Sequence, residues 1–495
     1  MKKKNRGKKF LKVLSIILAV IILLGVAGTV VNAIGCTAQL RNVDNFNTVK
    51  YDNQLVPQKD DDNVWTFTTD KDFRVMQLTD VHIGAGWMST SKDTMALGAV
   101  ASMISAEKPD LVIVTGDIVY PVPFQAGTFN NMKSAEIFAT LMENLQVYWV
   151  PVFGNHDTEI YSKYTREDIS GFYSDEKWSY CLFNDNYEDY VDGFCNQVVN
   201  VKNSQGIITQ SFYTFDTHSY VDGDYLGIGW KYDNIHDSQV DWYKNSIKKY
   251  NEYNVELINT GDFENKEELL KKYSTVKSLA FWHVPNTENL DAWNEYVEAG
   301  YKDTKNVKYH YGVVGETGKM VYSGVYPDEI FETMLSLGST KGIFVGHDHL
   351  NNFSIEYKGI RLTYGFSIDY LAYSGISKLG SQRGCTMITV KPDGSFDCVA
   401  ENYYQDKYSH DLREEIAFLK GQQCINTPVL RVERDVIKLG TQVNFERIND
   451  IPADFLKREA VRRLTDQLEP FIEWNLVETE YGNALKGSVY IASRG

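Results

Sequence analysis

Residues 147–157 read Val-Tyr-Trp-Val-Pro-Val-Phe-Gly-Asn-His-Asp, and this stretch decides the fold class. An apolar run that stops abruptly at glycine and polar residues is typical of a buried strand that ends in a tight turn. The same pattern occurs twice upstream, where residues 73–80 end in Asp and residues 111–117 end in Gly-Asp. Apolar side chains recur at helical spacing in the intervening residues 95–104 and 132–145. This β-α-β-α-β order predicts an α/β fold with a mostly parallel sheet covered by helices.

Two later strands are predicted to end in the same way. Residues 276–283 end in His, and residues 342–349 end in Gly-His-Asp-His. Long insertions, residues 161–203 and 287–324, lie between the strands and are rich in Tyr, Asp and Gly. We therefore expect five strands that each end in polar side chains.

The polar residues that follow these five strands are of unusual types. They are Asp80, His82, Asp117, Asn155, His156, Asp157, His283, His347, Asp348 and His349. Taken singly, each motif is explained by a turn or a surface histidine, but five in succession that each close a strand favour a shared site. Ligands of open α/β sheets bind outside the carboxyl ends of the strands. Oxygen and imidazole ligands without thiolate suit Mn²⁺, Fe or Zn²⁺.

The motif order from Asp80 to His349 resembles that of the calcineurin-like metallophosphoesterases: DxH, GD, GNH(D/E), a lone His and GHxH. Residues 280–285, 237–243 and 345–351 are similar to a fungal and plant branch often labelled purple-acid-phosphatase-like. The resemblance covers about residues 72–404. It implies a metallophosphoesterase-type β-sandwich core flanked by helices, expected over residues 71–405.

The resemblance also implies two divalent metal ions, Mn, Fe or Zn, about 3.5–4 Å apart. The implied ligands are Asp80, His82 and His349 for one ion, Asn155, His283 and His347 for the other, and Asp117 between the two. A metal-bridging hydroxide would attack the phosphorus atom of a phosphate ester. His156, which is not a ligand, would stabilise or protonate the leaving oxygen, and Asp157 would orient its imidazole.

Two residues near these motifs invite a different interpretation. Tyr120 follows Asp117 by three positions, where purple acid phosphatases place an iron-binding tyrosine. Because His82 already supplies a ligand, we expect Tyr120 to pack or to form a hydrogen bond. A second Thr-Gly-Asp, residues 260–262, follows a predicted strand at residues 255–259. It precedes an acidic helical stretch, so Asp262 is expected to cap that helix.

The amino-terminal residues predict membrane association. Residues 1–12 contain seven basic side chains and no acidic one, so the rest of the chain carries a net charge of −23. Such an acidic body disfavours nucleic-acid binding. Residues 13–34 are long and apolar enough to cross a bilayer, with the basic start in the cytoplasm and the body outside. The alternative is a cleaved signal peptide and a secreted protein. Residues 35–70 are expected to form a stalk.

The six cysteines and the carboxyl-terminal residues carry weaker signals. Cys181 is near enough in sequence to pair with Cys195, and Cys385 with Cys398, but free buried cysteines fit equally well. Residues 406–495 are expected to form a small α+β appendage. It would contain a helix at residues 453–468, then a hairpin of residues 471–479 and 486–492.

The sequence therefore favours a membrane-anchored phosphoesterase with an extracellular catalytic domain and a phosphate-ester substrate. The alternative is a catalytically silent surface binding module on the same fold, which the aromatic-rich insertions would suit. A silent module usually loses metal ligands, and every ligand position of the motif series is present here. The insertions do not distinguish between monoesters, diesters, cyclic nucleotides and phosphoproteins.

Overall fold

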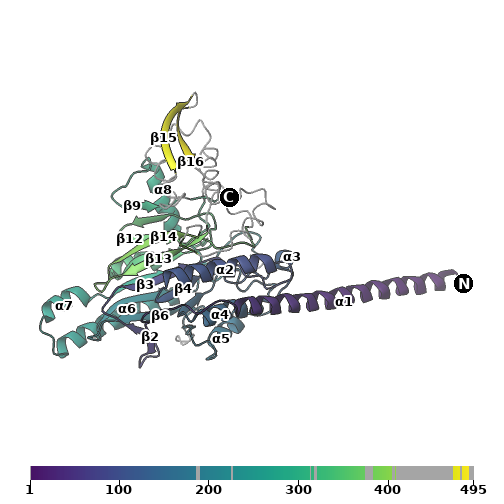
Figure 1. The fold of residues 1–495 in the computed structure, drawn as a ribbon, viewed down its shortest axis with the longest axis horizontal. Coiled ribbons are helices and arrows are strands. Elements are labelled where there is room, and N and C mark those ends of the chain that lie inside the picture. The colour runs from purple at the N-terminus through teal and green to yellow at the C-terminus, as the bar shows by residue number, and fades with distance from the viewer. Residues whose placement is uncertain are drawn as a thin grey trace.

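The computed structural model describes residues 2–184, 190–224, 227–312, 314–316, 320–373, 383–403, 407–408, 472–479 and 482–489. Within these residues the chain forms two large sheets with helices outside them (Figure 1). The smaller sheet has the order β14 (Phe396–Asn402), β13 (Gly384–Val390), β3 (Phe73–Leu78), β4 (Leu111–Thr115) and β5 (Trp149–Val152). Its strands β3, β4 and β5 are parallel, as predicted.

The larger sheet has nine strands. Their order is β1 (Gln58–Lys59), β2 (Trp65–Thr68), β6 (Gln197–Lys202), β7 (Ile208–Thr214), β8 (Lys277–Phe281), β10 (Thr340–Val345), β12 (Ile360–Tyr364), β11 (Ser354–Tyr357) and β9 (Val307–Tyr311). Strands β7, β8, β10 and β12 are parallel neighbours. Their carboxyl ends therefore lie along one edge, as do those of β3, β4 and β5 in the smaller sheet.

The two sheets pack face to face around an aromatic core. Phe73 of the smaller sheet stacks on Phe212 of the larger one, with ring centroids 5.6 Å apart. Phe396 of the smaller sheet meets Phe344 of the larger one edge to face, with ring centroids 6.1 Å apart. Strand β4 is buried along its whole length, because the second sheet covers one face and helices cover the other. The expected sandwich core is therefore confirmed.

Helices cover the outer faces of both sheets. Side chains of α2 (Thr90–Glu107) and α4 (Asn131–Leu145) join the core of the smaller sheet. Side chains of α6 (Asp237–Thr260), α8 (Thr287–Glu298) and α9 (Ile330–Leu337) cover the larger one. The shorter helices are α3 (Pro123–Ala126), α5 (Arg166–Tyr173) and α7 (Lys266–Tyr273).

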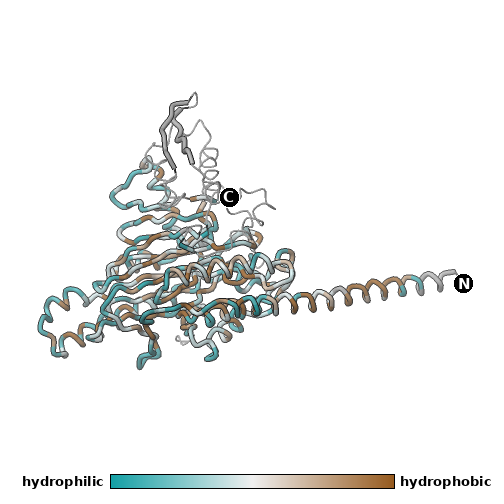
Figure 2. Tube along the Cα trace, viewed as in Figure 1, coloured by the Kyte–Doolittle hydropathy of each residue, from teal (hydrophilic) through white to brown (hydrophobic). Residues whose placement is uncertain are grey.

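Helix α1 (Lys2–Val43) projects from the body as one long helix whose middle part, residues 13–34, is apolar (Figures 1 and 2). Among the described residues it is the one helix long and apolar enough to cross a membrane, a property that amino-terminal signal sequences share. The expected stalk is wrong, because α1 continues to Val43 and packs on α2 and α4. Cys36, Gln39 and Val43 recur at helical spacing and are buried there.

The predicted strand at residues 255–259 is also wrong. These residues form the last turns of α6, where Tyr250, Asn254 and Ile258 are buried at helical spacing. The helix that follows, α7, has Asn265 at its N-cap, and Asp262 is exposed in the turn before it. Asp262 is therefore not the expected cap.

The carboxyl-terminal residues form a hairpin, in which β15 (Ile472–Thr479) pairs antiparallel with β16 (Gly482–Val489), so the second strand begins at Gly482 and not at residue 486 as expected. The helix expected at residues 453–468 lies outside the described residues. Five cysteines are described, and all are free and buried, which is one of the two alternatives that the sequence left open.

Candidate metal centre

The motif residues meet where the carboxyl ends of both sheets come together. Each predicted ligand follows a strand: Asp80 and His82 after β3, Asp117 after β4, Asn155 after β5, His283 after β8, and His347 and His349 after β10. Most of these side chains are almost wholly inaccessible to solvent. The structure therefore brings together residues that are separated by up to 269 positions in the sequence.

Four of these residues have a left-handed backbone conformation, which residues other than glycine rarely adopt. The φ angles of Asp80, His82, Asp117 and His347 are 52°, 54°, 54° and 74°. Hydrogen bonds hold this conformation in place: the Asp80 amide donates to the Gly116 carbonyl at 3.1 Å, and the His82 amide to the Asp117 carbonyl at 3.0 Å. Such left-handed residues cluster at functional sites, where the surrounding structure imposes them.

The motif glycines allow the loops to approach closely. Gly116 has a φ of 84°, and a Cβ atom there would lie 2.5 Å from Nδ1 of His283. A Cβ atom on Gly154 would lie 2.2 Å from Oδ1 of Asp117. A larger residue at either position would displace a predicted ligand that comes from another strand.

One carboxylate oxygen lies between ligands of the two expected metal ions. Oδ2 of Asp117 is 3.1 Å from Nε2 of His82 and 3.3 Å from Nε2 of His283. One ligand atom each of Asp80, His82, Asp117 and His349 lies within 4.8 Å of the others. This is the arrangement expected of a ligand that bridges two cations.

The orientation of His283 suits a bound cation. Its Nδ1 lies 2.8 Å from the carbonyl oxygen of Thr115, so Nδ1 carries the hydrogen. Its Nε2 faces Oδ1 of Asn155 at 3.2 Å and the Asp117 carboxylate, both of which are acceptors. Three groups with lone pairs are stable together only around a proton or a metal ion. His347 completes this side, with its ring centroid 5.1 Å from that of His283.

The electrostatic field points to the same conclusion. Burial acts to lower the pKa of His82 and of His283, but neighbouring carboxylates outweigh it. The charge of Asp369 beside His82 and that of Asp117 beside His283 raise each pKa to about 9. A field that attracts protons this strongly also attracts divalent cations, which compete for the same nitrogen atoms.

Asp369 was not anticipated from the sequence. Its two carboxylate oxygens lie 3.3 Å from Nδ1 of His82 and 3.2 Å from Nδ1 of His349. Backbone amides of Leu371 and Ala372 donate to this carboxylate at 2.7 Å. Asp369 thus holds the imidazoles of two predicted ligands with Nε2 turned toward the centre. The residues around it form no recognisable motif, so only the fold identifies it.

The surroundings of His156 correct one expectation. Nδ1 of His156 contacts Oε1 of Glu159 at 2.8 Å, whereas Asp157 points beneath the loop. Asp157 accepts hydrogen bonds from the backbone amides of Asp117, Val119 and Gly154. It therefore holds the turn together, because a carboxylate with three amide donors is not available to the imidazole. The hydroxyl of Tyr220 also donates to Glu159, at 3.0 Å.

Tyr120 packs and forms a hydrogen bond, as expected. Its ring centroid lies 4.8 Å from that of His82 and 4.9 Å from that of His156. Its hydroxyl donates to Oε1 of Gln125 at 2.8 Å.

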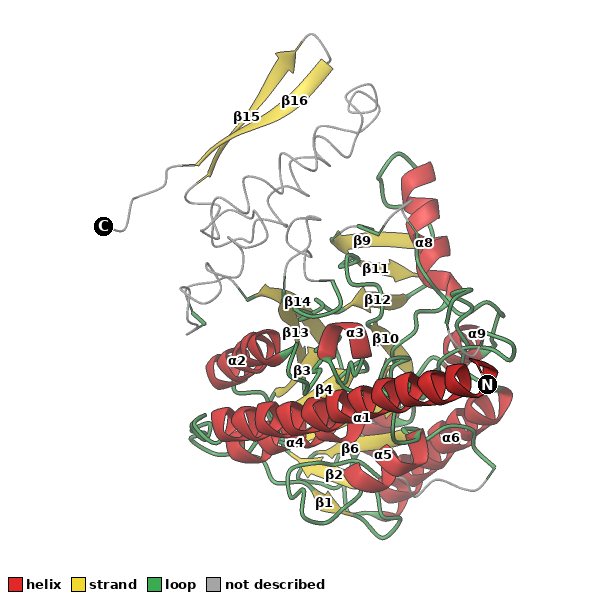
Figure 3. Cartoon of the chain, turned by 90° about the vertical axis from the view of Figure 1, so that its right-hand side faces the viewer, coloured by secondary structure: helices red, strands yellow, loops and turns green. Residues whose placement is uncertain are grey.

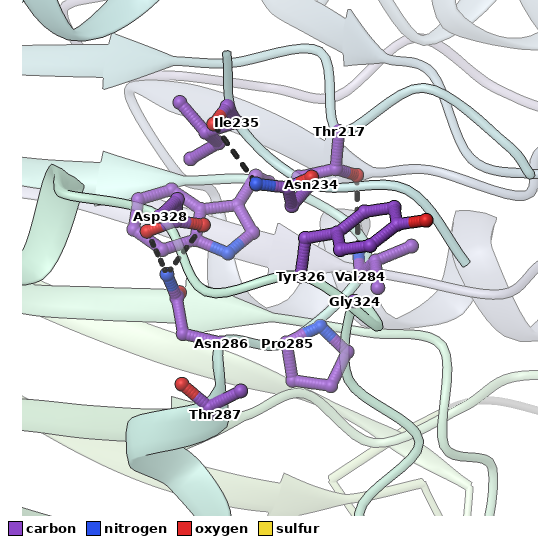
Figure 4. A pocket seen from close by; sticks show the side chains of 11 residues that line it. Thr217, Asn234, Ile235, Val284, Pro285, Asn286, Thr287, Gly324, Tyr326 and Asp328 are labelled. Atoms are coloured by element: carbon purple, nitrogen blue, oxygen red, sulfur yellow. Dashed lines mark hydrogen bonds between the residues drawn. The ribbon is translucent and has the colours of Figure 1, made fainter. Parts of the chain in front are cut away.

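A separate hollow lies behind the loop that carries His283 (Figure 4). It is lined by Trp282, Val284 and Asn286 of this loop, among others. Asn286 donates to Asp328 at 3.3 Å, and the Val284 amide donates to Thr217 at 3.1 Å. These polar groups form hydrogen bonds with one another and so stabilise the loop that carries His283.

Comparison with known proteins agrees with this geometry. A family model described as calcineurin-like phosphoesterase matches residues 73–351, more than half of the chain. Two Arabidopsis thaliana proteins, named probable inactive purple acid phosphatase 14 and 29, are 27% and 26% identical to the chain. These alignments cover 63% and 66% of this chain and 74% and 78% of the relatives.

Two further similarities are more distant. Phosphatase DCR2 of Saccharomyces cerevisiae is 25% identical over 58% of this chain and 46% of its own length. The crystal structure of a dimetal phosphatase from Danio rerio aligns over 67% of this chain and all of that one, with 10% identity and a TM-score of 0.40. On the family match, the chain belongs to the calcineurin-like phosphoesterases.

Proposed function

We propose that this protein hydrolyses phosphate esters with two divalent metal ions. The observation that carries the proposal is the position of the Asp117 carboxylate, which lies between His82 and His283. The residues that would hold the two ions are Asp80, His82, His349, Asn155, His283, His347 and the shared Asp117. Bound at this position, the ions would supply positive charge for the phosphoryl oxygens and a nucleophile at neutral pH.

His156 is the proposed general acid. Its side chain is 27% exposed, whereas Glu159 beneath it is 4% exposed. The Glu159 carboxylate accepts a hydrogen bond from Nδ1, which leaves Nε2 to face a substrate. From there Nε2 would donate a proton to the leaving oxygen. Glu159 takes the orienting role that the family resemblance assigned to Asp157.

The direct test is hydrolysis of p-nitrophenyl phosphate and of its bis-ester by the full chain with added Mn²⁺, Fe²⁺ or Zn²⁺. We expect turnover that is lost with a chelator and restored by metal. Metal binding without hydrolysis of either ester, or of a panel of phosphorylated metabolites, would contradict the proposal.

That outcome would support the second candidate, a catalytically silent binding module. The names of the two Arabidopsis relatives favour it, since both are called probably inactive. The complete ligand set of this chain and its buried, convergent geometry favour the enzyme. The hydrolysis assay distinguishes the two.

We further propose that α1 anchors the protein in a membrane, with the body on the outer side. Seven basic residues precede the apolar part of α1, which is exposed along its length. Protease added to intact cells should remove the body. Protection until the cells are lysed would reverse the orientation, and a mature protein that begins near residue 34 would show secretion after cleavage.

A further inference from the structure

The junction between α1 and the body is held by specific contacts. Asn32 uses both ends of its amide: Nδ2 donates to the Gly127 carbonyl at 2.7 Å, and Oδ1 accepts from the Trp87 amide at 2.9 Å. Two turns further along, Gln39 hydrogen-bonds to the Thr90 carbonyl and to Oγ1 of Thr94. Because these contacts join helix and body directly, α1 fixes the direction in which the body faces.

Large apolar side chains are exposed on both segments that Asn32 contacts. Trp87 is 52% exposed and Met88 45%, and on the second segment Phe124 is 90% exposed and Phe129 53%. We call these four residues the junction patch. Figure 1 shows α3, which carries Phe124, at the end of the body from which α1 projects, and Figure 3 shows it beside α1 from that end. Clustered exposed apolar residues mark interaction sites.

The length of α1 places this patch at the edge of a bilayer. Lys12 is the last basic residue before the apolar run, and Asn32 is its last polar residue before the junction. The helical rise separates them by about 30 Å, which is the thickness of the hydrocarbon core. The bilayer surface therefore falls at Asn32, level with Trp87 and Gly127.

The patch also adjoins the metal centre. Trp87 follows His82 by five residues in the same loop. Phe124 precedes Gln125, which accepts the hydrogen bond from Tyr120, whose ring contacts His82. A body seated on the patch would hold the metal centre close to the membrane surface.

We propose that the junction patch rests in the interfacial layer of the bilayer that α1 enters, and so fixes the metal centre close to the lipid headgroups. Trp and Phe favour this layer, where their apolar rings leave water. The proposal rests on the membrane anchor proposed above, which supplies the continuity between patch and bilayer. It predicts that Phe124 contacts lipid although it lies outside the transmembrane helix.

The test uses the full chain in phosphatidylcholine–phosphatidylglycerol vesicles, with Phe124→Cys labelled by an environment-sensitive fluorophore. Val56→Cys is the matched control, because Val56 is 62% exposed and lies in the segment that contacts Leu145 and Gln146 before β5, at the opposite edge of the sheet. The unmodified chain, taken through the same labelling, gives the background from its native cysteines.

We expect blue-shifted emission from the label at position 124 and quenching by nitroxide lipids labelled near the headgroup, with neither effect at position 56. If vesicle-bound protein gave the same emission, typical of a label in water, at both positions, the junction patch would not lie in the bilayer interface, although α1 would still be the anchor. Failure to enter vesicles at all would overturn both. A blue shift that appears without lipid and grows with protein concentration would assign the patch to a second copy of the chain instead.

Discussion

The same three residues, Thr-Gly-Asp, occur at 115–117 and at 260–262, but in different structural settings. Thr115 ends a strand that is buried along its whole length, whereas Thr260 ends a helix and its hydroxyl bonds back to the Glu256 carbonyl. Gly116 has a φ of 84°, and Gly261 a φ of −69°. Asp117 is buried among histidines, and Asp262 is exposed. A short motif therefore acquires chemistry only through the element that precedes it and the loops that meet it.

The largest expected effect comes from Asp117→Asn. The change removes the negative charge that lies between His82 and His283, so the shared oxygen would become a weaker metal ligand. We expect two-metal occupancy and phosphoesterase turnover to disappear together. Metal content by elemental analysis and turnover of p-nitrophenyl phosphate measure this, with circular dichroism as the check on folding. An active, metal-loaded Asp117→Asn protein would show that the centre is wrongly assigned.

His156→Ala should separate proton transfer from metal binding. With every ligand intact, we expect full metal content and a kcat lower by about 10²–10⁴-fold, the usual cost of losing a general acid. Esters whose leaving group departs without a proton should lose less. Glu159→Gln should show the same pattern to a smaller extent, because the imidazole remains but loses its carboxylate partner. Loss of metal from His156→Ala would refute the non-ligand role.

Asp369→Asn tests whether orientation of the imidazoles matters apart from ligation. Asn keeps the size of the side chain but loses the charge that faces His82 and His349, so both rings are held less firmly. We expect metal affinity to fall by about 10–100-fold. Titration of the metal-free protein with Mn²⁺, Fe²⁺ or Zn²⁺ measures this. An unchanged affinity together with unchanged turnover would make Asp369 a purely structural residue.

The contrast between the two segments also explains what the sequence could predict. Strand β4 and Gly116 were predictable because an unbroken apolar run followed by Gly-Asp has few other structural solutions. Residues 255–259 are as apolar as a short strand, and only the longer pattern from Tyr243 to Ile258 reveals one face of a helix. A window of five residues is too short to distinguish the period of a helix from that of a strand.

Site residues differ in the same way. The motif residues follow one another in a fixed order, so the sequence alone predicted that they would lie together. Asp369 and Glu159 contact their histidines only in the folded chain. Asp369 lies 287 residues after His82, and Glu159 lies three residues after His156. The partner of His156 could not be predicted from sequence distance. Asp157 is nearer in sequence, but its carboxylate accepts hydrogen bonds from three backbone amides, and Glu159 contacts the imidazole instead.

Asp262→Asn should have the smallest effect and completes the comparison. Its side chain is exposed in the turn between α6 and α7, where Asn and Asp are both common turn formers, and Asn265 occupies the N-cap position of α7. We therefore expect a change of less than about 0.5 kcal/mol in the free energy of unfolding, with metal content and turnover as in the unmodified protein. Denaturant unfolding of this variant beside Asp117→Asn measures both quantities under one set of conditions. If Asp262→Asn lost its metals while Asp117→Asn kept them, the second Thr-Gly-Asp would be the functional one, and the strand ends would have been joined into the wrong site.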